Sequence, residues 1–328
     1  MLKKNIFNLL TFFVAIFVSI ILLEVLLRVL NFDSWVLYED DLDEPTTNKY
    51  DEKIGWKSKE GIYIFPPKTA DANSTTFTIL KDGSRFNGKP INDSNEEIVL
   101  IGGSWVQGVA VDDQETFAWL LQKKLPNFKV KNYGVAGYGT YQSYLLLEEI
   151  LKNKNNIQYI IYFFMDHHEI RNVGDTGWLS HITKYSKRDT LYLPYAQLDK
   201  NQNLIEYKPI KYIALPLREY SALITRIERK IMRIKFFSLY KDKTKITQKI
   251  ILKMKEISEK NGSEFLFINL LSSKDILAPY VKFSKENNIP FIDCGYKLNI
   301  DLVVQNDGHP NHKLHKLYAE CIYNSAFN

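Results

Sequence analysis

The sequence predicts an α/β protein in which helices cover a parallel β-sheet. From residue 97 onward, short apolar runs alternate with segments of helical periodicity, which is typical of strands joined by crossover helices. The strands are expected at 98–101, 130–133, 159–164, 264–270 and 290–293. The helices are expected at 116–124, 141–152, 245–259, 277–287 and 313–325. With 328 residues, 45% of them hydrophobic, the chain is long enough for one large core and an appendage.

The first 31 residues predict a membrane anchor. Residues 5–30 are apolar, with Glu24 and Arg28 as their only charged side chains, and this length suffices to span the ~30 Å apolar core of a bilayer. A cleaved signal peptide is the alternative, but it usually has a shorter apolar region followed by a small-x-small site, which is absent here. Lys3 and Lys4 favour a cytoplasmic N-terminus, so we expect the rest of the chain on the extracytoplasmic side.

Residues 32–95 are polar and are expected to form a juxtamembrane linker with short β segments. They contain an acidic cluster at 39–44 and turn signals at 66–67, 82–83 and 87–88. The domain proper is expected at 96–328.

An insertion at about 172–240 interrupts the alternation of strands and helices. A hairpin is expected at 191–207, around Lys200-Asn201, and a basic amphipathic helix at 217–237. The apolar positions of that helix are Ile224, Ile227, Ile231 and Ile234, with Arg226, Arg229, Lys230 and Arg233 between them. Such a helix either rests on anionic lipid or packs on the domain with a solvated basic face, and the second is the ordinary interpretation.

Charge and cysteine content narrow the function classes. The net charge is +5, with no block of like charges and no nucleic-acid-binding motif, so a nucleic-acid partner is not expected. Cys294 and Cys321 are too far apart for a C-x-x-C motif. They are either buried thiols or one disulfide.

Two segments carry chemistry. In IVLIGGSWVQG at 98–108, an apolar run ends in two glycines and Ser104, which places the serine at a strand end, as a nucleophile or as the cap of the next helix. Asp307 and His309 lie two residues apart, and in an extended segment they would point the same way, so that the carboxylate orients the imidazole. An isolated DGH sequence would more simply be a turn with a surface histidine.

Four ordered blocks together resemble the SGNH (GDSL-type) hydrolase family. They are GGSWVQG, NYGVAGYGT, IIYFFMDHHEIRN and DGHPNHKLHKLYAE. The resemblance implies a flavodoxin-like three-layer αβα sandwich and the cleavage of acyl esters. It also implies that Ser104 is the nucleophile, His309 the general base and Asp307 its partner. The backbone N–H groups of Ser104 and Gly137 would then hold the oxyanion.

The chain departs from the family pattern at three places. Gly103 stands where the family has an aspartate, and Asp307 precedes His309 by two residues where many members have three. Asp166 stands where the family commonly has an asparagine that donates to the oxyanion, and an ionised aspartate cannot donate. We expect His168 as the third donor, because it would share a side with Asp166 in an extended segment and Arg171 is close enough in sequence to keep Asp166 charged. The alternatives are a protonated Asp166 or no third donor at all.

Competing motifs fit less well. GGSWV lacks the second glycine of a G-x-S-x-G elbow, and GVAGYGT lacks the lysine of a phosphate loop. The histidines at 309, 312 and 315 suggest a metal site, but surface histidines on a helix are commoner, so neither a metal nor a cofactor is expected.

The sequence therefore predicts a membrane-anchored serine hydrolase, an esterase or O-deacetylase, acting on an acylated small molecule or cell-envelope glycan outside the cytoplasm. Hydrolysis and acyl transfer use the same residues, so both stay open, as does the oligomeric state. A non-catalytic glycan-binding or assembly protein on the same fold is the alternative, and metal-dependent hydrolysis through the histidines is a third.

Overall fold

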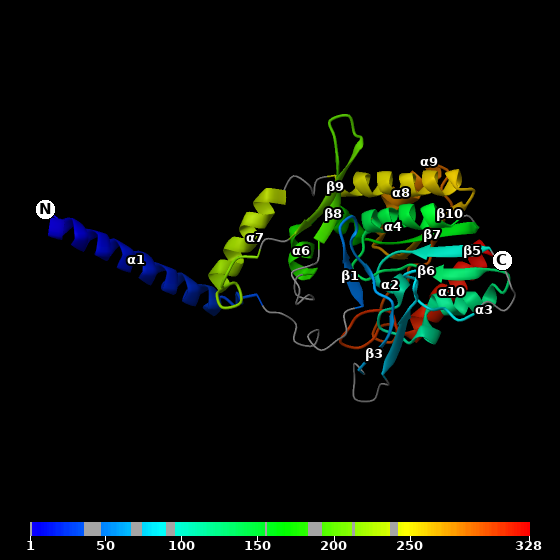
Figure 1. Ribbon diagram of the computed structural model, residues 1–328, viewed down its shortest axis with the longest axis horizontal. Helices are drawn as coiled ribbons and strands as arrows, with labels where there is room; N and C mark the ends of the chain where they lie inside the picture. The colour runs from blue at the N-terminus through cyan, green and yellow to red at the C-terminus, as the bar shows by residue number, and fades with distance from the viewer. Residues whose placement is uncertain are drawn as a thin grey trace.

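The computed structural model describes residues 2–35, 47–66, 74–89, 96–154, 156–182, 192–211, 214–236 and 242–328. The predicted acidic cluster at 39–44 and the residues at 67, 191 and 237 lie outside these ranges. In Figure 1 a long N-terminal helix projects from a domain in which helices cover both faces of a sheet.

The central sheet has five parallel strands in the order β11-β10-β7-β5-β6. They are β5 (Glu97–Ile101), β6 (Lys129–Asn132), β7 (Ile157–Met165), β10 (Glu264–Leu271) and β11 (Phe291–Asp293). The strand order reverses at β5, which is the flavodoxin-like arrangement, and such sheets bind ligands at the carboxyl ends of the strands beside the reversal. The predicted fold class and all five predicted strands are confirmed.

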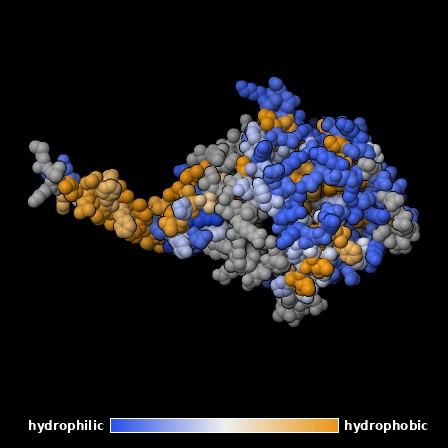
Figure 2. Space-filling model, in the orientation of Figure 1, coloured by the Kyte–Doolittle hydropathy of each residue, from blue (hydrophilic) through white to orange (hydrophobic). Residues whose placement is uncertain are grey.

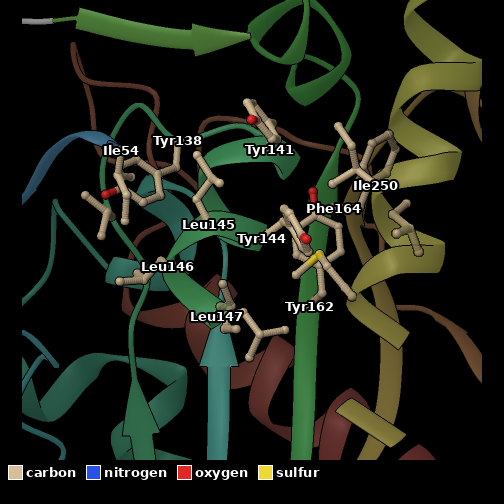
Figure 3. Packing of buried hydrophobic residues seen from close by; sticks show 14 of the residues in the cluster. Ile54, Tyr138, Tyr141, Tyr144, Leu145, Leu146, Leu147, Tyr162, Phe164 and Ile250 are labelled. Atoms are coloured by element: carbon tan, nitrogen blue, oxygen red, sulfur yellow. The ribbon is translucent and has the colours of Figure 1, made fainter. Parts of the chain in front are cut away.

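The strands alternate their side chains between two hydrophobic cores. Val99 and Ile160 face one core, with α4 (Thr140–Asn153), α8 (Lys243–Lys260) and α9 (Lys274–Glu286). Figure 3 shows side chains of α4, β7 and α8 meeting in it. Ile98 and Ile161 face the other core, with α3 (Phe117–Lys124) and α10 (His312–Ala326). The sandwich thus has three layers, and the five helices predicted for it are present.

Residues 47–66 and 74–89 contain two pairs of antiparallel strands that pack on the domain. They are β1 (Asn48–Asp51) with β2 (Gly55–Ser58), and β3 (Gly61–Phe65) with β4 (Thr75–Ile79). Arg85, which follows β4 in the sequence, is fully buried, and its Nε donates to Asp113 at 2.8 Å. Its Nη1 also donates to the carbonyls of Gln107 (2.8 Å) and Gly108. This segment therefore supports the short helix that carries Ser104.

The insertion contains the predicted hairpin and the predicted basic helix. The elements are α5 (His168–Asn172), α6 (Thr176–Ile182), β8 (Tyr192–Leu198), β9 (Leu204–Lys211) and α7 (Ala222–Phe236). The basic helix begins at Ala222 and not at residue 217 as expected. Leu217 has a positive φ of 65°, and the Ser221 hydroxyl accepts a hydrogen bond from the Ile224 N–H (3.1 Å), which starts the helix after it.

Helix α1 (Leu2–Val29) is the apolar N-terminal segment. Within Lys4–Val29 the most apolar window of 18 residues has a mean hydropathy of 2.8 and none of it is buried, so the helix is long and apolar enough to cross a membrane. The hydrophobic colour in Figure 2 runs along this projecting helix.

Cys294 and Cys321 form a disulfide, with their Cα atoms 5.9 Å apart. The bond connects the segment that follows β11 to α10. Asp307 and His309 lie just before the first residue of α10. Of the two alternatives that the sequence left open, the structure has the disulfide.

Candidate active site at the carboxyl edge of the sheet

Ser104 lies directly after β5, at the first residue of α2 (Ser104–Gln107). The turn before it needs glycine, because a Cβ on Gly102 would lie 2.6 Å from Val106 Cγ2. The helix ends at Gly108, which has a φ of +76°. Ser104 is only 8% exposed. The turn therefore holds the serine at the sheet edge and shields most of its surface from water.

His309 and Asp307 meet Ser104 from the other end of the chain. The distance from His309 Nε2 to Ser104 Oγ is 2.9 Å, and that from His309 Nδ1 to Asp307 Oδ1 is 2.5 Å. In this hydrogen-bonded arrangement the Asp307 carboxylate accepts from the Nδ1–H of His309, which leaves Nε2 free to accept the proton of Ser104. The structure thus brings together the three residues that the sequence proposed as nucleophile, base and orienting carboxylate.

The contact between Asp307 and His309 comes from a turn and not from the extended segment we expected. Gly308 between them has a φ of +81°, and the amides of Asp307 and Gly308 both donate to the Val304 carbonyl (3.2 and 3.0 Å). Asp307 Oδ1 also accepts from the backbone N–H of His309 (3.1 Å). A tight turn therefore sets the two side chains against each other before α10 begins.

The loop after β6 runs alongside the helix that carries Ser104. The Asn132 amide donates to the Val106 carbonyl (2.7 Å) and its oxygen accepts from the Gly134 N–H (2.9 Å). Gly134 lies so close to α2 that a Cβ there would be 2.3 Å from the backbone nitrogen of Gln107. The start of the loop is therefore locked against the nucleophile helix.

The middle of the same loop is held by side chains from three directions. Gln107 Oε1 accepts from the Ala136 N–H (2.8 Å), and Trp56 Nε1 donates to the Ala136 carbonyl (3.1 Å). Gly137 follows with a φ of +84°, where a Cβ would lie 3.0 Å from the Trp56 ring. Arg171 Nη1 donates to the carbonyl of Tyr138, the residue after Gly137 (2.8 Å). Within the described residues the N–H groups of Ser104 and Gly137 have no acceptor, so both are available as donors.

The third block does not have the extended conformation on which our expectation for His168 rested. β7 ends before Asp166, and His167 has helical angles (φ −69°, ψ −8°). The ring of His168 is fully buried, with Nδ1 2.9 Å from the Tyr162 hydroxyl. A Cβ on Gly103 would lie 3.1 Å from His168 Nε2. The imidazole therefore fills the room that an aspartate side chain at position 103 would need.

Electrostatics set the protonation states in this block. The contact with His167, 3.6 Å between Nδ1 and Asp166 Oδ1, lowers the pKa of Asp166, so this carboxylate is ionised and only accepts hydrogen bonds. Burial, Arg171 and His309 lower the pKa of His167 to about 4, although Asp166 opposes them. Burial lowers the pKa of His168 well below its ordinary value. Both imidazoles are therefore neutral near pH 7, and each carries one N–H donor.

The C-terminal histidines have separate roles. His315 is fully buried, and its Nδ1 accepts from the backbone N–H of Phe117 (3.2 Å). His312 is the first residue of α10. Within the described residues no group of three or more His, Cys, Asp or Glu side chains could hold a metal ion.

Several supporting residues were not singled out from the sequence. Asn132 lies inside a quoted block, where a polar residue at a strand end is its only signal, and Arg171 was expected to act on the charge of Asp166 and not on the loop that carries Gly137. Gln107 is a polar residue in an apolar turn, and His167 was passed over in favour of its neighbour. Trp56 gave no signal, because it lies in a segment expected to be a linker.

Comparisons with known proteins find related architectures only. No protein-family model matches the chain, and no curated protein matches it. Among solved structures, a member of the lipolytic G-D-S-L family from Veillonella parvula is 13% identical, with a TM-score of 0.41, covering 71% of this chain and 98% of that one.

Two further solved structures are similar to the same degree. A putative lipolytic protein of the G-D-S-L family from Desulfitobacterium hafniense is 14% identical, with a TM-score of 0.41 and coverage of 70% of this chain and 99% of that chain. A psychrotrophic esterase from Pseudoalteromonas sp. is 12% identical, with a TM-score of 0.41 and coverage of 70% and 96%.

Proposed function

We propose that this protein is a membrane-anchored serine hydrolase that cleaves or transfers the acyl group of an ester. The observation that carries the proposal is the pair of hydrogen bonds that links Ser104, His309 and Asp307 at the carboxyl edge of the sheet. Ser104 lies near the start of the domain sequence, and Asp307 and His309 lie near its end. If Asp307-Gly308-His309 were only a surface turn, His309 would have no reason to contact Ser104. The four sequence blocks that resemble SGNH hydrolases support the same activity.

The geometry suits a two-step acyl transfer. Ser104 Oγ attacks the acyl carbonyl while His309 Nε2 takes the serine proton, and Asp307 stabilises the imidazolium that forms. The N–H groups of Ser104 and Gly137 donate to the oxyanion, and such a donor is typically worth ~10²–10³ in rate. His309 then protonates the leaving alcohol. Water or a sugar hydroxyl, activated by the same imidazole, releases the acyl group.

The apolar helix and the disulfide support an extracytoplasmic location for the catalytic domain. Helix α1 is long and apolar enough to cross a membrane, and Lys3 and Lys4 precede its apolar part. The bond between Cys294 and Cys321 is typical of an oxidising environment outside the cytoplasm. An acylated glycan of the cell envelope is the substrate class that an enzyme tethered there would meet.

A fluorophosphonate probe tests the proposal on the full chain. We expect covalent labelling of the wild type and none of Ser104→Ala, because the probe reacts only with an activated serine. Ser273→Ala is the matched control, since Ser273 is exposed and its side chain caps nothing at the start of α9. Folded wild-type protein that resists the probe would overturn the proposal.

The competing function is a non-catalytic binding protein on the same fold. One observation favours it: an ionised Asp166 stands where an oxyanion donor is expected. A binding protein would leave the probe unreacted while retaining affinity for an acylated glycan. The labelling experiment therefore separates the two functions.

A further inference from the structure

The first turn of α7 is bound to the end of α1. The Glu24 carboxylate of α1 accepts from the Ser221 hydroxyl (2.8 Å) and from the N–H groups of Ala222 (3.0 Å) and Leu223 (2.9 Å). A carboxylate in this position satisfies N–H groups that a helix start leaves unpaired and complements the helix dipole. Arg28 donates both to Glu24 (2.8 Å) and to the carbonyl of Tyr220 (2.9 Å). Three hydrogen bonds to Glu24 and one from Arg28 thus join α1 to the start of α7.

The segment that leaves α1 strengthens this junction. The Trp35 N–H donates to Thr225 Oγ1 (3.0 Å), and the guanidinium of Arg218 lies 3.8 Å from the centre of the Trp35 ring. The guanidinium of Arg226 lies 3.5 Å from the centre of the Phe32 ring. Glu24 is five residues before the end of α1 at Val29, which is about 7.5 Å along a helix. The start of α7 is therefore held close to the end of α1, beside the last part of its apolar stretch.

Helix α7 has one face toward the domain and one face away from it. Thr225, Glu228 and Met232 are each 1% exposed. On the other side Ile227 and Ile231, one turn apart, are 44% and 47% exposed. The outward surface of the helix therefore includes two isoleucines, although a soluble helix normally directs such residues inward.

Further exposed apolar residues precede α7, and basic residues are exposed along it. Leu217 and Tyr220, just before the helix, are 63% and 75% exposed. Arg229, Lys230 and Arg233 are exposed on the helix itself. The acidic residue of the helix, Glu228, is buried against Arg218. An exposed surface of isoleucines flanked by basic side chains matches an anionic lipid interface.

Figure 1 shows where α7 lies relative to the anchor. It stands between α1 and the domain and runs across the direction of α1. In Figure 2 the hydrophobic colour of α1 continues beyond its end onto the neighbouring part of the domain. A helix that runs across a membrane-spanning helix at its exit lies along the membrane surface.

We propose that α7 lies on the extracytoplasmic surface of the membrane that α1 crosses. Ile227 and Ile231 then lie at the boundary between headgroups and acyl chains. The exposed basic residues contact anionic headgroups, and they are Arg229, Lys230 and Arg233. The proposal rests on the anchoring by α1 proposed above. This second attachment fixes the rotation of the domain about α1. The carboxyl edge with Ser104 is then held at a constant orientation to the bilayer.

Site-directed labelling of the full chain in nanodiscs tests the proposal. Within the described residues there is no free cysteine, so a single introduced cysteine reports one position. Ile231→Cys carries an environment-sensitive fluorophore, and phospholipids with a quencher in the upper acyl chain report contact with lipid. We expect several-fold stronger quenching at Ile231→Cys than at Val281→Cys, a residue of α9 that is similarly exposed at 46%. Ile227→Cys is the second reporter on the same face.

The controls separate the two levels of the proposal. Val14→Cys, in the middle of α1, is quenched if the anchor spans the bilayer. Quenching at position 14 together with equal, weak quenching at 231 and 281 would overturn the surface contact and leave the anchor intact. Absence of quenching at position 14 would overturn the anchor, and fluorophosphonate labelling of the same samples reports the catalytic proposal independently.

The contact between the basic residues of α7 and anionic headgroups is tested by changing the lipid composition. Replacing Arg229, Lys230 and Arg233 by glutamine is expected to weaken quenching at Ile231→Cys in nanodiscs of phosphatidylcholine with phosphatidylglycerol. In nanodiscs of phosphatidylcholine alone the substitutions are expected to have little effect, since headgroup attraction is then absent. Equal effects in both lipids would contradict the electrostatic part.

Discussion

The two sides of Ser104 are built differently. On one side the imidazole of His309 and the carboxylate of Asp307 are 29% and 15% exposed, and a single turn around Gly308 sets them against each other. On the other side the loop that carries Gly137 is held by buried side chains, among them Asn132 and Gln107.

The roles proposed above for the two sides account for the difference. An imidazole that takes and returns a proton needs contact with the substrate's leaving group and with water. Backbone donors stabilise an oxyanion only if they already point at it, because reorientation during the reaction costs free energy. The base side therefore needs access, whereas the donor side needs rigidity.

Asp307→Asn is expected to have the largest effect. An asparagine keeps the size of the side chain but cannot stabilise the imidazolium and can favour the wrong imidazole tautomer, so the rate of ester cleavage should fall ~10³–10⁴-fold. Hydrolysis of a chromogenic short-chain ester by the solubilised full chain measures it, with the melting temperature as the control for folding. A rate within a few-fold of the wild type would show that Asp307 does not orient His309.

Gly137→Ala tests the donor side. Because Gly137 has a φ of +84° and a Cβ would lie 3.0 Å from the Trp56 ring, the loop must shift and the rate should fall ~10²-fold. Gly262→Ala is the matched control, with a φ of +76° and open space around the position of its Cβ. If both variants lose activity equally, the loss reflects backbone strain and not the oxyanion donor.

His315→Asn is expected to change the pH dependence of stability and to affect the rate least. Burial, followed by Arg85, lowers the pKa of His315 from 6.5 to about 3, so the unfolded chain binds a proton that the folded protein excludes. The free energy of unfolding therefore falls as pH falls below about 6.5, by about 1.4 kcal/mol per unit for this group.

Denaturant titrations at two pH values measure this effect. Asn retains an acceptor for the Phe117 N–H but does not titrate. Between about pH 7 and about pH 5, the wild type should lose about 2 kcal/mol more than His315→Asn. An equal loss in both proteins would mean that other groups, such as His167 and His168, account for the acid sensitivity.

Much of the fold could be predicted because its signals are local. Buried parallel strands have nearly continuous apolar sequences, and β5, β7 and β10 all follow that rule. The start of α7 could not be predicted, because its N–H groups donate to Glu24, some two hundred residues earlier. For the same reason Trp56 could not be assigned to the loop that carries Gly137.

The sequence alone determined the α/β class, the order of the elements, the apolar N-terminal helix and the residues able to form a nucleophile, a base and an orienting carboxylate. Periodicity, glycine turns and residue chemistry are properties of neighbouring positions, so they can be read along the chain. Only the tertiary structure decided that Ser104 and His309 lie within hydrogen-bonding distance, that Cys294 and Cys321 are bonded, and that His168 is buried beneath Gly103. Those facts depend on packing between segments far apart in sequence, which no local pattern specifies.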